Sequence, residues 1–92
     1  MAQDPYYELL ALSNALGGEV GELQNVIKKL YRDDRPMGEE FVHEAGDVLH
    51  YLVRLIILMA GDDGVQFVMD ENKRKLDARR AANHPLGPPH LA

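Results

Sequence analysis

Apolar residues recur with a helical period along the first third of the chain, between residues 9 and 30. The series consists of Leu9, Leu12, Leu16, Val20, Leu23, Val26, Ile27 and Leu30. Asp4 and Pro5 precede it and suit the N-cap and the first helical position. Gly17 and Gly18 interrupt it, which is consistent with a kink, a break into two helices or a close backbone contact. The pattern predicts a helix that begins at Asp4–Pro5 and extends to about residue 30.

A second helix is predicted over residues 39–60, after a segment at 32–38 that has the composition of a turn. Its first half is amphipathic, whereas residues 52–59 are apolar nearly all round. A helix that is apolar on all sides is buried on all sides, and one short chain has few elements to surround it. We therefore expect a subunit interface along this helix, with burial inside a single subunit as the alternative.

Residues 61–64 end the second helix and begin a third, which is predicted to run to about residue 82. Asp63 and Gln66 have the spacing of a capping box. No long alternation of apolar and polar residues indicates a strand, so the pattern predicts an all-α fold: an antiparallel helical hairpin plus a third helix. The helical domain is expected to span residues 1–82, and the proline-rich tail 83–92 is expected to be irregular.

The amino-acid composition and net charge argue against some classes of binding partner. The chain has 92 residues, no cysteine and a net charge of -5. An acidic chain is a poor binder of nucleic acid or of anionic membranes, and no apolar run is long enough to span a bilayer. No secretory leader is evident, because Asp4 and Glu8 stand where a leader is basic or apolar. We expect a cytoplasmic protein whose small core is supplemented by oligomerisation or by a bound metal.

Two carboxylate doublets are the most informative feature of the chain: Glu19 with Glu22, and Glu44 with Asp47. Each has i, i+3 spacing, which places two acids on one helical face. The doublets are centred at 20.5 and 45.5, and the midpoint, 33, falls inside the predicted turn. In an antiparallel hairpin they would face each other. Four carboxylates at one level are unfavourable without cations, and oxygen ligands favour Mg²⁺ or Mn²⁺.

Two alternatives to this cation site remain open. The acids could be solvated on outer faces and paired with Lys28, Lys29 or Arg54. His43, Asp47 and His50, at i, i+4 and i+7, could form a zinc-type constellation. A histidine beside such a cluster is more often packed or hydrogen bonded to a ligand than bound to the metal.

The predicted third helix carries the opposite charge. Asn72, Lys75 and Arg79 lie at i, i+3 and i+7 and form one polar-to-basic stripe. Cations near a helix C-terminus can simply complement the helix dipole. The same stripe would suit a polyphosphate, because lysine acts as a point charge and arginine can bind phosphate with two hydrogen bonds.

Three ordered segments within residues 9–80 resemble the MazG-like all-α nucleoside triphosphate pyrophosphohydrolases. They read ALGGEVGEL at 15–23, EAGDVLHYL at 44–52 and NKRKLDAR at 72–79. The resemblance implies an Mg²⁺-dependent enzyme that cleaves a nucleoside triphosphate between its α and β phosphates, for removal of non-standard or surplus nucleotides. It also implies a four-helix-type bundle completed by oligomerisation, as a dimer or a dimer of dimers.

The same resemblance implies roles for individual residues. The metal would be held by Glu19, Glu22, Glu44 and Asp47, with Mn²⁺ as an alternative to Mg²⁺. Glu19 or Glu22 would take the proton of the attacking water. The substrate, chiefly its phosphates, would be bound by Asn72, Lys75 and Arg79.

The chain departs from the family pattern at two positions. Gly18 stands where many members carry an additional acid, and His50 stands where relatives often have tryptophan. Near the N-terminus, Tyr6, Tyr7 and Asn14 are candidates for a base pocket, although such tyrosines are more often core or interface residues. Two other functions remain open: a phosphoribosyl-ATP pyrophosphohydrolase, against which the third segment argues, and a non-catalytic helical assembly module.

Overall fold

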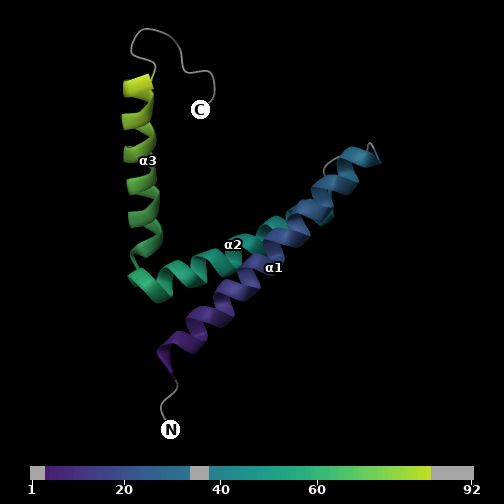
Figure 1. Cartoon of the computed structure of the whole chain (residues 1–92), viewed down its shortest axis with the longest axis horizontal. Helices are drawn as coiled ribbons and strands as arrows, with labels where there is room; N and C mark the ends of the chain where they lie inside the picture. The colour runs from purple at the N-terminus through teal and green to yellow at the C-terminus, as the bar shows by residue number, and fades with distance from the viewer. Residues whose placement is uncertain (1–3, 34–37, 84–92) are drawn as a thin grey trace.

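The computed structural model describes residues 4–33 and 38–83, and this part of the chain is all-helical, without strands. The helices are α1 (Pro5–Arg32), α2 (Glu39–Ala60) and α3 (Gly64–Asn83) (Figure 1). The predicted all-α class is therefore confirmed. Among the described residues, none of the helices combines the length and apolar character that crossing a bilayer requires.

Helix α1 begins as its sequence predicts. The Asp4 side chain accepts a hydrogen bond from the Tyr6 backbone N–H at 2.9 Å, and Pro5 occupies the first turn. The helix continues through Gly17 and Gly18, so it does not break there. A Cβ built on either glycine meets no atom within 4 Å, so no close contact within the subunit requires them.

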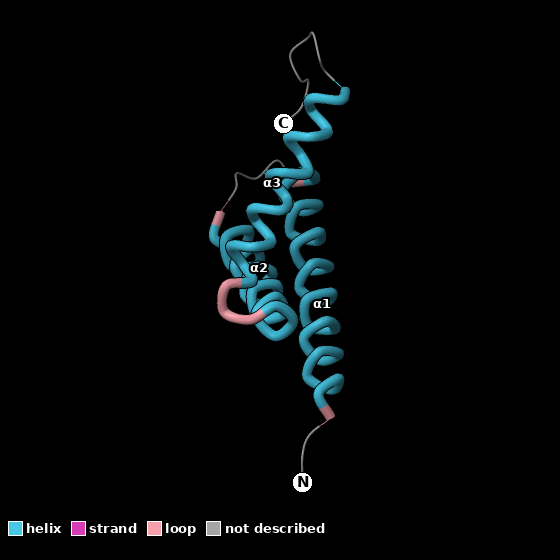
Figure 2. Tube along the Cα trace, turned by 90° about the vertical axis from the view of Figure 1, so that its left-hand side faces the viewer, coloured by secondary structure: helices cyan, strands magenta, loops and turns pink. Residues whose placement is uncertain are grey.

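Helices α1 and α2 form an antiparallel hairpin (Figures 1 and 2). Lys29 Nζ and Glu40 Oε2 lie 4.0 Å apart near its closed end; most of the predicted turn, residues 34–37, falls outside the described residues. The hairpin buries little: Leu12 and Val26 of α1, at 5% and 6% exposure, are the buried hydrophobic residues of the described chain. No residue of α2 is buried. Burial of α2 inside a single subunit, the alternative considered above, is therefore wrong.

Helix α3 leaves the end of α2 at a steep angle and projects away from the hairpin (Figure 1). Among the described residues it contacts α2 and makes no contact with α1. The Phe67 backbone N–H donates to the Asp63 carbonyl at 3.1 Å, but the Gln66 side chain donates to Asp70 at 2.8 Å. The reciprocal side-chain bond of the predicted capping box is thus replaced by a bond to the next turn. Asn83 still belongs to α3, and the rest of the predicted tail lies outside the described residues.

Candidate metal centre

Three of the four predicted carboxylates meet between α1 and α2. One oxygen each of Glu19, Glu44 and Asp47 lies within 4.8 Å of the other two. Glu19 comes from the middle of α1, and Glu44 and Asp47 come from successive turns of α2, whose antiparallel course brings them level with it. Glu19 and Glu44 are half-buried, and Asp47 is exposed. We call these three residues the acidic cluster.

The electrostatics of the acidic cluster are unfavourable in the absence of a cation. The pKa of Glu19 is raised above its ordinary value, first by burial, and then by the charge of Glu44, by a hydrogen bond with Asp47 and by the charges of Asp47 and Glu22. The Oε2 atom of Glu44 is buried and has no hydrogen-bond partner. A buried oxygen without a donor is unfavourable, so its surroundings suit an electropositive ligand.

No lysine or arginine neutralises the acidic cluster within the described chain. The ion pair of Lys29 goes to Glu40 rather than to a member of the cluster, and Lys28 and Arg54 form no ion pair with it. The alternative that the acids of the cluster pair with Lys28, Lys29 or Arg54 is therefore not seen among the described residues. Three oxygen ligands that converge from two helices fit a hard divalent cation.

Glu22 lies outside the acidic cluster, and its side chain is exposed. It is still close enough for its charge to contribute to the raised pKa of Glu19. His43 and His50 are exposed and, among the described residues, neither joins the group that could hold a metal. The His50 ring packs edge-on against Tyr51, with centroids 5.0 Å apart and planes at 74°. The zinc-type constellation is thus not assembled in the described chain.

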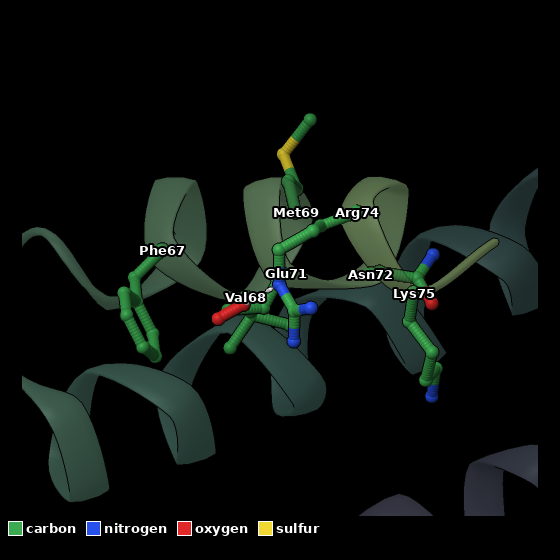
Figure 3. A pocket seen from close by; sticks show the side chains of 7 residues that line it. All are labelled: Phe67, Val68, Met69, Glu71, Asn72, Arg74 and Lys75. Carbon is green, nitrogen blue, oxygen red and sulfur yellow. Dashed lines mark hydrogen bonds and ion pairs between the residues drawn. The ribbon is translucent and has the colours of Figure 1, made fainter. Parts of the chain in front are cut away.

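Two of the three predicted phosphate-binding residues, Asn72 and Lys75, line a pocket of about 430 Å³ on α3. Phe67 and Val68 contribute its apolar part, and Glu71 and Arg74 complete it together with Met69. Figure 3 shows the Lys75 and Phe67 side chains extending from the same side of the helix, whereas Met69 points away. The pocket combines an apolar wall with amide and cationic groups, which the spacing of the basic residues alone does not indicate.

The cations of α3 fall into two groups. Lys73 binds Asp77 at 2.6 Å, Arg74 binds Glu71 at 2.8 Å, and Arg80 lies 3.9 Å from Asp77. Lys75 and Arg79 form no ion pair with any described residue. The two cations that sequence reasoning selects as phosphate ligands are therefore available to an external anion.

The acidic cluster and the basic stripe are not brought together within one subunit. The cluster lies in the hairpin, whereas the stripe lies on α3, which does not contact α1 in the described chain. Tyr6, Tyr7 and Asn14 are exposed on α1, and they line neither the pocket at Asn72 and Lys75 nor the one beside Glu44.

No family model matches the chain, and no curated protein or solved structure is detectably similar to it. The fold and the candidate site therefore define an all-α protein whose helical hairpin gathers three carboxylates. The MazG-like resemblance rests on the three sequence segments.

Proposed function

We propose that the protein is a Mg²⁺-dependent nucleotide pyrophosphohydrolase that cleaves a nucleoside triphosphate between the α and β phosphates. The observation that carries this proposal is the acidic cluster, with a buried Glu44 oxygen that lacks a partner. The MazG-like resemblance of the three segments supplies the reaction. Hydrolysis adds one water across the α–β anhydride and yields a nucleoside monophosphate and pyrophosphate.

The donor set of the acidic cluster fits Mg²⁺, and Mn²⁺ as its alternative, because all three ligands are carboxylate oxygens. Glu19, Glu44 and Asp47 would hold the ion, and the resemblance adds Glu22 at the edge of the site. The bound ion would offset the charge of phosphate oxygens and favour deprotonation of the attacking water.

Glu19 is the better candidate for the base of the two acids that the resemblance selects. One of its carboxylate oxygens belongs to the acidic cluster, so the other oxygen would be placed to accept a proton from a water that the ion holds. Glu22 is exposed, has no place in the acidic cluster and acts through its charge. Glu19 would therefore accept the water proton, while Glu44 and Asp47 orient the site.

The phosphates would be bound by the basic stripe. Lys75 and Arg79 have no ion-pair partner among the described residues, so binding a phosphate requires no internal pair to be broken. Asn72 and Lys75 share a pocket whose apolar wall is formed by Phe67 and Val68. That pocket can accommodate both a charged and a less polar part of one substrate.

A second copy of the chain would complete the site. Helix α2 has no buried residue, and large apolar side chains remain exposed on α2 and α3, for example Met59, Phe67 and Met69 at 67%, 63% and 59%. Packing two or four chains into a four-helix-type bundle would cover these surfaces. It would also allow the basic stripe of one subunit to approach the acidic cluster of another.

The test is a pyrophosphate-release screen with canonical and modified nucleoside triphosphates in the presence of Mg²⁺ or Mn²⁺. Phosphoribosyl-ATP is included because the related histidine-pathway activity uses the same type of acidic motif. We expect release of pyrophosphate and a monophosphate from at least one nucleotide, and none with chelator. Absence of release across the panel with both metals would contradict the proposal.

A non-catalytic assembly module is the second candidate, and the exposed apolar surface of α2 and α3 favours it. The two functions differ in their response to ligand. A pyrophosphohydrolase should melt at a higher temperature with Mg²⁺ plus a non-hydrolysable nucleotide, because binding to the folded state stabilises it. An assembly module should show no such shift.

A further inference from the structure

The connection between α2 and α3 is short and tightly bonded. Gly61 ends α2 with φ of 82°, and its N–H donates to the Ile57 carbonyl at 2.8 Å. The Gly64 N–H then donates to the Gly61 carbonyl at 2.9 Å, which closes the turn. Gly64 is the first residue of α3 and the buried residue of that helix. The direction of α3 is thus set within four residues.

Gly64 lies against the last turns of α2 with no room for a side chain. A Cβ built on Gly64 would lie 2.8 Å from Ala60 Cβ, 3.0 Å from Ile56 Cγ2 and 3.1 Å from the Ile56 carbonyl oxygen. Carbon atoms in favourable contact are about 3.5–4.0 Å apart, so α3 would have to move away from α2. The other helical glycines of the described chain meet no atom within 4 Å: Gly17, Gly18, Gly21 and Gly46.

A small change at this contact becomes large along α3. At about 1.5 Å per residue, Lys75 lies about 16 Å and Arg79 about 22 Å from Gly64. Since α3 makes no contact with α1, the hairpin does not restrain its far end within the subunit. A tilt of about 10° at Gly64 would displace Lys75 by about 3 Å and Arg79 by about 4 Å. A shift of that size is as long as a hydrogen bond and removes a phosphate contact.

We propose that Gly64 is a positioning residue: its missing side chain lets α3 pack directly on the end of α2, and this packing places Lys75 and Arg79 for phosphate binding. The structural part of this proposal stands on the contact with Ala60 and Ile56. Its consequence for phosphate rests on the proposed function.

The chain contains no cysteine, so a pair of introduced cysteines reports the direction of α3 without background labelling. Exposed Ser13 on α1 and Ala81 on α3 are replaced by cysteine and spin-labelled. Labelled chains are diluted into excess unlabelled protein, so that the measured distance joins α1 and α3 of one chain. We expect Gly64→Ala to shift the principal distance by up to about 4 Å, because a tilt of about 10° moves the end of α3 by that amount. Gly17→Ala, the same change at a helical position with open space, should leave the distance unchanged.

A rescue variant separates a steric cause from loss of folding. Ala60→Gly removes the atom that lies nearest to the added Cβ, so Ala60→Gly/Gly64→Ala should bring the distance most of the way back. An unchanged distance in Gly64→Ala, or a shift that the double variant does not reduce, overturns the role of Gly64. This outcome is independent of whether the protein hydrolyses nucleotides.

The consequence for phosphate is measured with inorganic tripolyphosphate and Mg²⁺ by calorimetry. Gly64→Ala should weaken tripolyphosphate binding at least about tenfold, and Ala60→Gly/Gly64→Ala should restore it. Mn²⁺ binding, followed by electron paramagnetic resonance without phosphate, should be unaffected, because the acidic cluster lies in the hairpin. A shifted distance with unchanged tripolyphosphate binding overturns the positioning role. Loss of Mn²⁺ binding in Gly64→Ala overturns it as well, because the effect of the substitution would then extend to the hairpin.

Discussion

Charged side chains are arranged in opposite ways in the hairpin and on α3. In the hairpin, packing of α1 against α2 gathers Glu19, Glu44 and Asp47, and no described cation neutralises them. On α3, local spacing neutralises most charges, as in the pair between Lys73 and Asp77 at i, i+4. Local pairs on an exposed helix are of little energetic consequence. A cluster of like charges formed by tertiary packing is unfavourable for folding, and therefore points to a ligand.

The comparison also shows that the two halves of the proposed site lie apart within one subunit. The acidic cluster lies in the hairpin, before the turn between α2 and α3. Lys75 and Arg79, which form no ion pair with described residues, lie on α3, and α3 does not contact α1 in the described chain. One triphosphate can contact both the metal site and the phosphate-binding cations only if the two lie close together, because charge interactions are screened over about 10 Å. The second subunit proposed above would cover the exposed apolar surface of α2 and α3 and would bring the two sites together.

The largest effect is expected in the hairpin. Glu44→Gln and Asp47→Asn each remove a ligand charge without changing side-chain size, and should lower kcat for pyrophosphate release by about 1,000-fold. Glu22 lies outside the acidic cluster, so Glu22→Gln should lower kcat by only about tenfold. Glu8→Gln, the same change at an exposed position in the first turn of α1, is the control and should retain full activity. Turnover of Glu44→Gln within a few-fold of wild type would contradict the metal centre.

A smaller effect is expected on α3, where the comparison between paired and unpaired cations can be tested directly. Lys75→Ala and Arg79→Ala should raise KM for the triphosphate about 10- to 100-fold, because each removes a charged phosphate contact. Lys73→Ala and Arg80→Ala, which remove cations already near Asp77, should change KM by less than about threefold. Equal effects in the two pairs of variants would show that the stripe acts only through its total charge.

Mixing the variants tests whether the two regions come from different subunits. Glu44→Gln and Lys75→Ala/Arg79→Ala chains are unfolded together, refolded at equal amounts and assayed. If each site combines the hairpin of one chain with α3 of another, about a quarter of wild-type activity should return, since half of the dimers are mixed and each mixed dimer has one intact site. Activity no greater than that of the separate variants would place both halves of the site in one chain.

Helix boundaries and the level of the carboxylates could be predicted from sequence because local rules determine them. Asp4 and Pro5 fix the start of α1, and the spacing of the two doublets around a short connection brings Glu19 level with Glu44 and Asp47. The exclusion of Glu22 could not be predicted in this way. Residues three apart differ by about 60° around a helix, so the packing rotation decides which acids join the cluster.

The direction of α3 could not be predicted from the periodicity of the sequence either. It depends on how closely Gly64 approaches Ala60 and Ile56, which is a tertiary contact. The signal in the sequence is a glycine at the first position of a helix, four residues after a small alanine. Such a pair indicates a close approach only when the turn between the helices is known. The apolar wall at Phe67 and Val68 was missed for a similar reason, because it becomes part of a pocket only in three dimensions.

The smallest expected effect concerns the pH dependence of stability in the metal-free protein. The pKa of Glu19 is raised above its ordinary value of 4.5 in the folded state, first by burial and then by the charge of Glu44. The folded state therefore binds the proton more tightly than the unfolded state does. The resulting stabilisation is fully present below the ordinary pKa and is lost as the pH rises through the raised pKa.

Glu19→Gln isolates this contribution, because glutamine resembles the protonated acid at every pH. Without metal, wild type and Glu19→Gln should melt at similar temperatures near pH 4, and wild type should melt at a lower temperature than the variant by about pH 7–8. Adding Mg²⁺ at the higher pH should raise the melting temperature of wild type but leave Glu19→Gln nearly unchanged, since the ion binds the deprotonated cluster. A difference between the two proteins that stays constant from pH 4 to pH 8 would show that Glu19 titrates normally, and the repulsion within the acidic cluster would then be too weak to favour a cation.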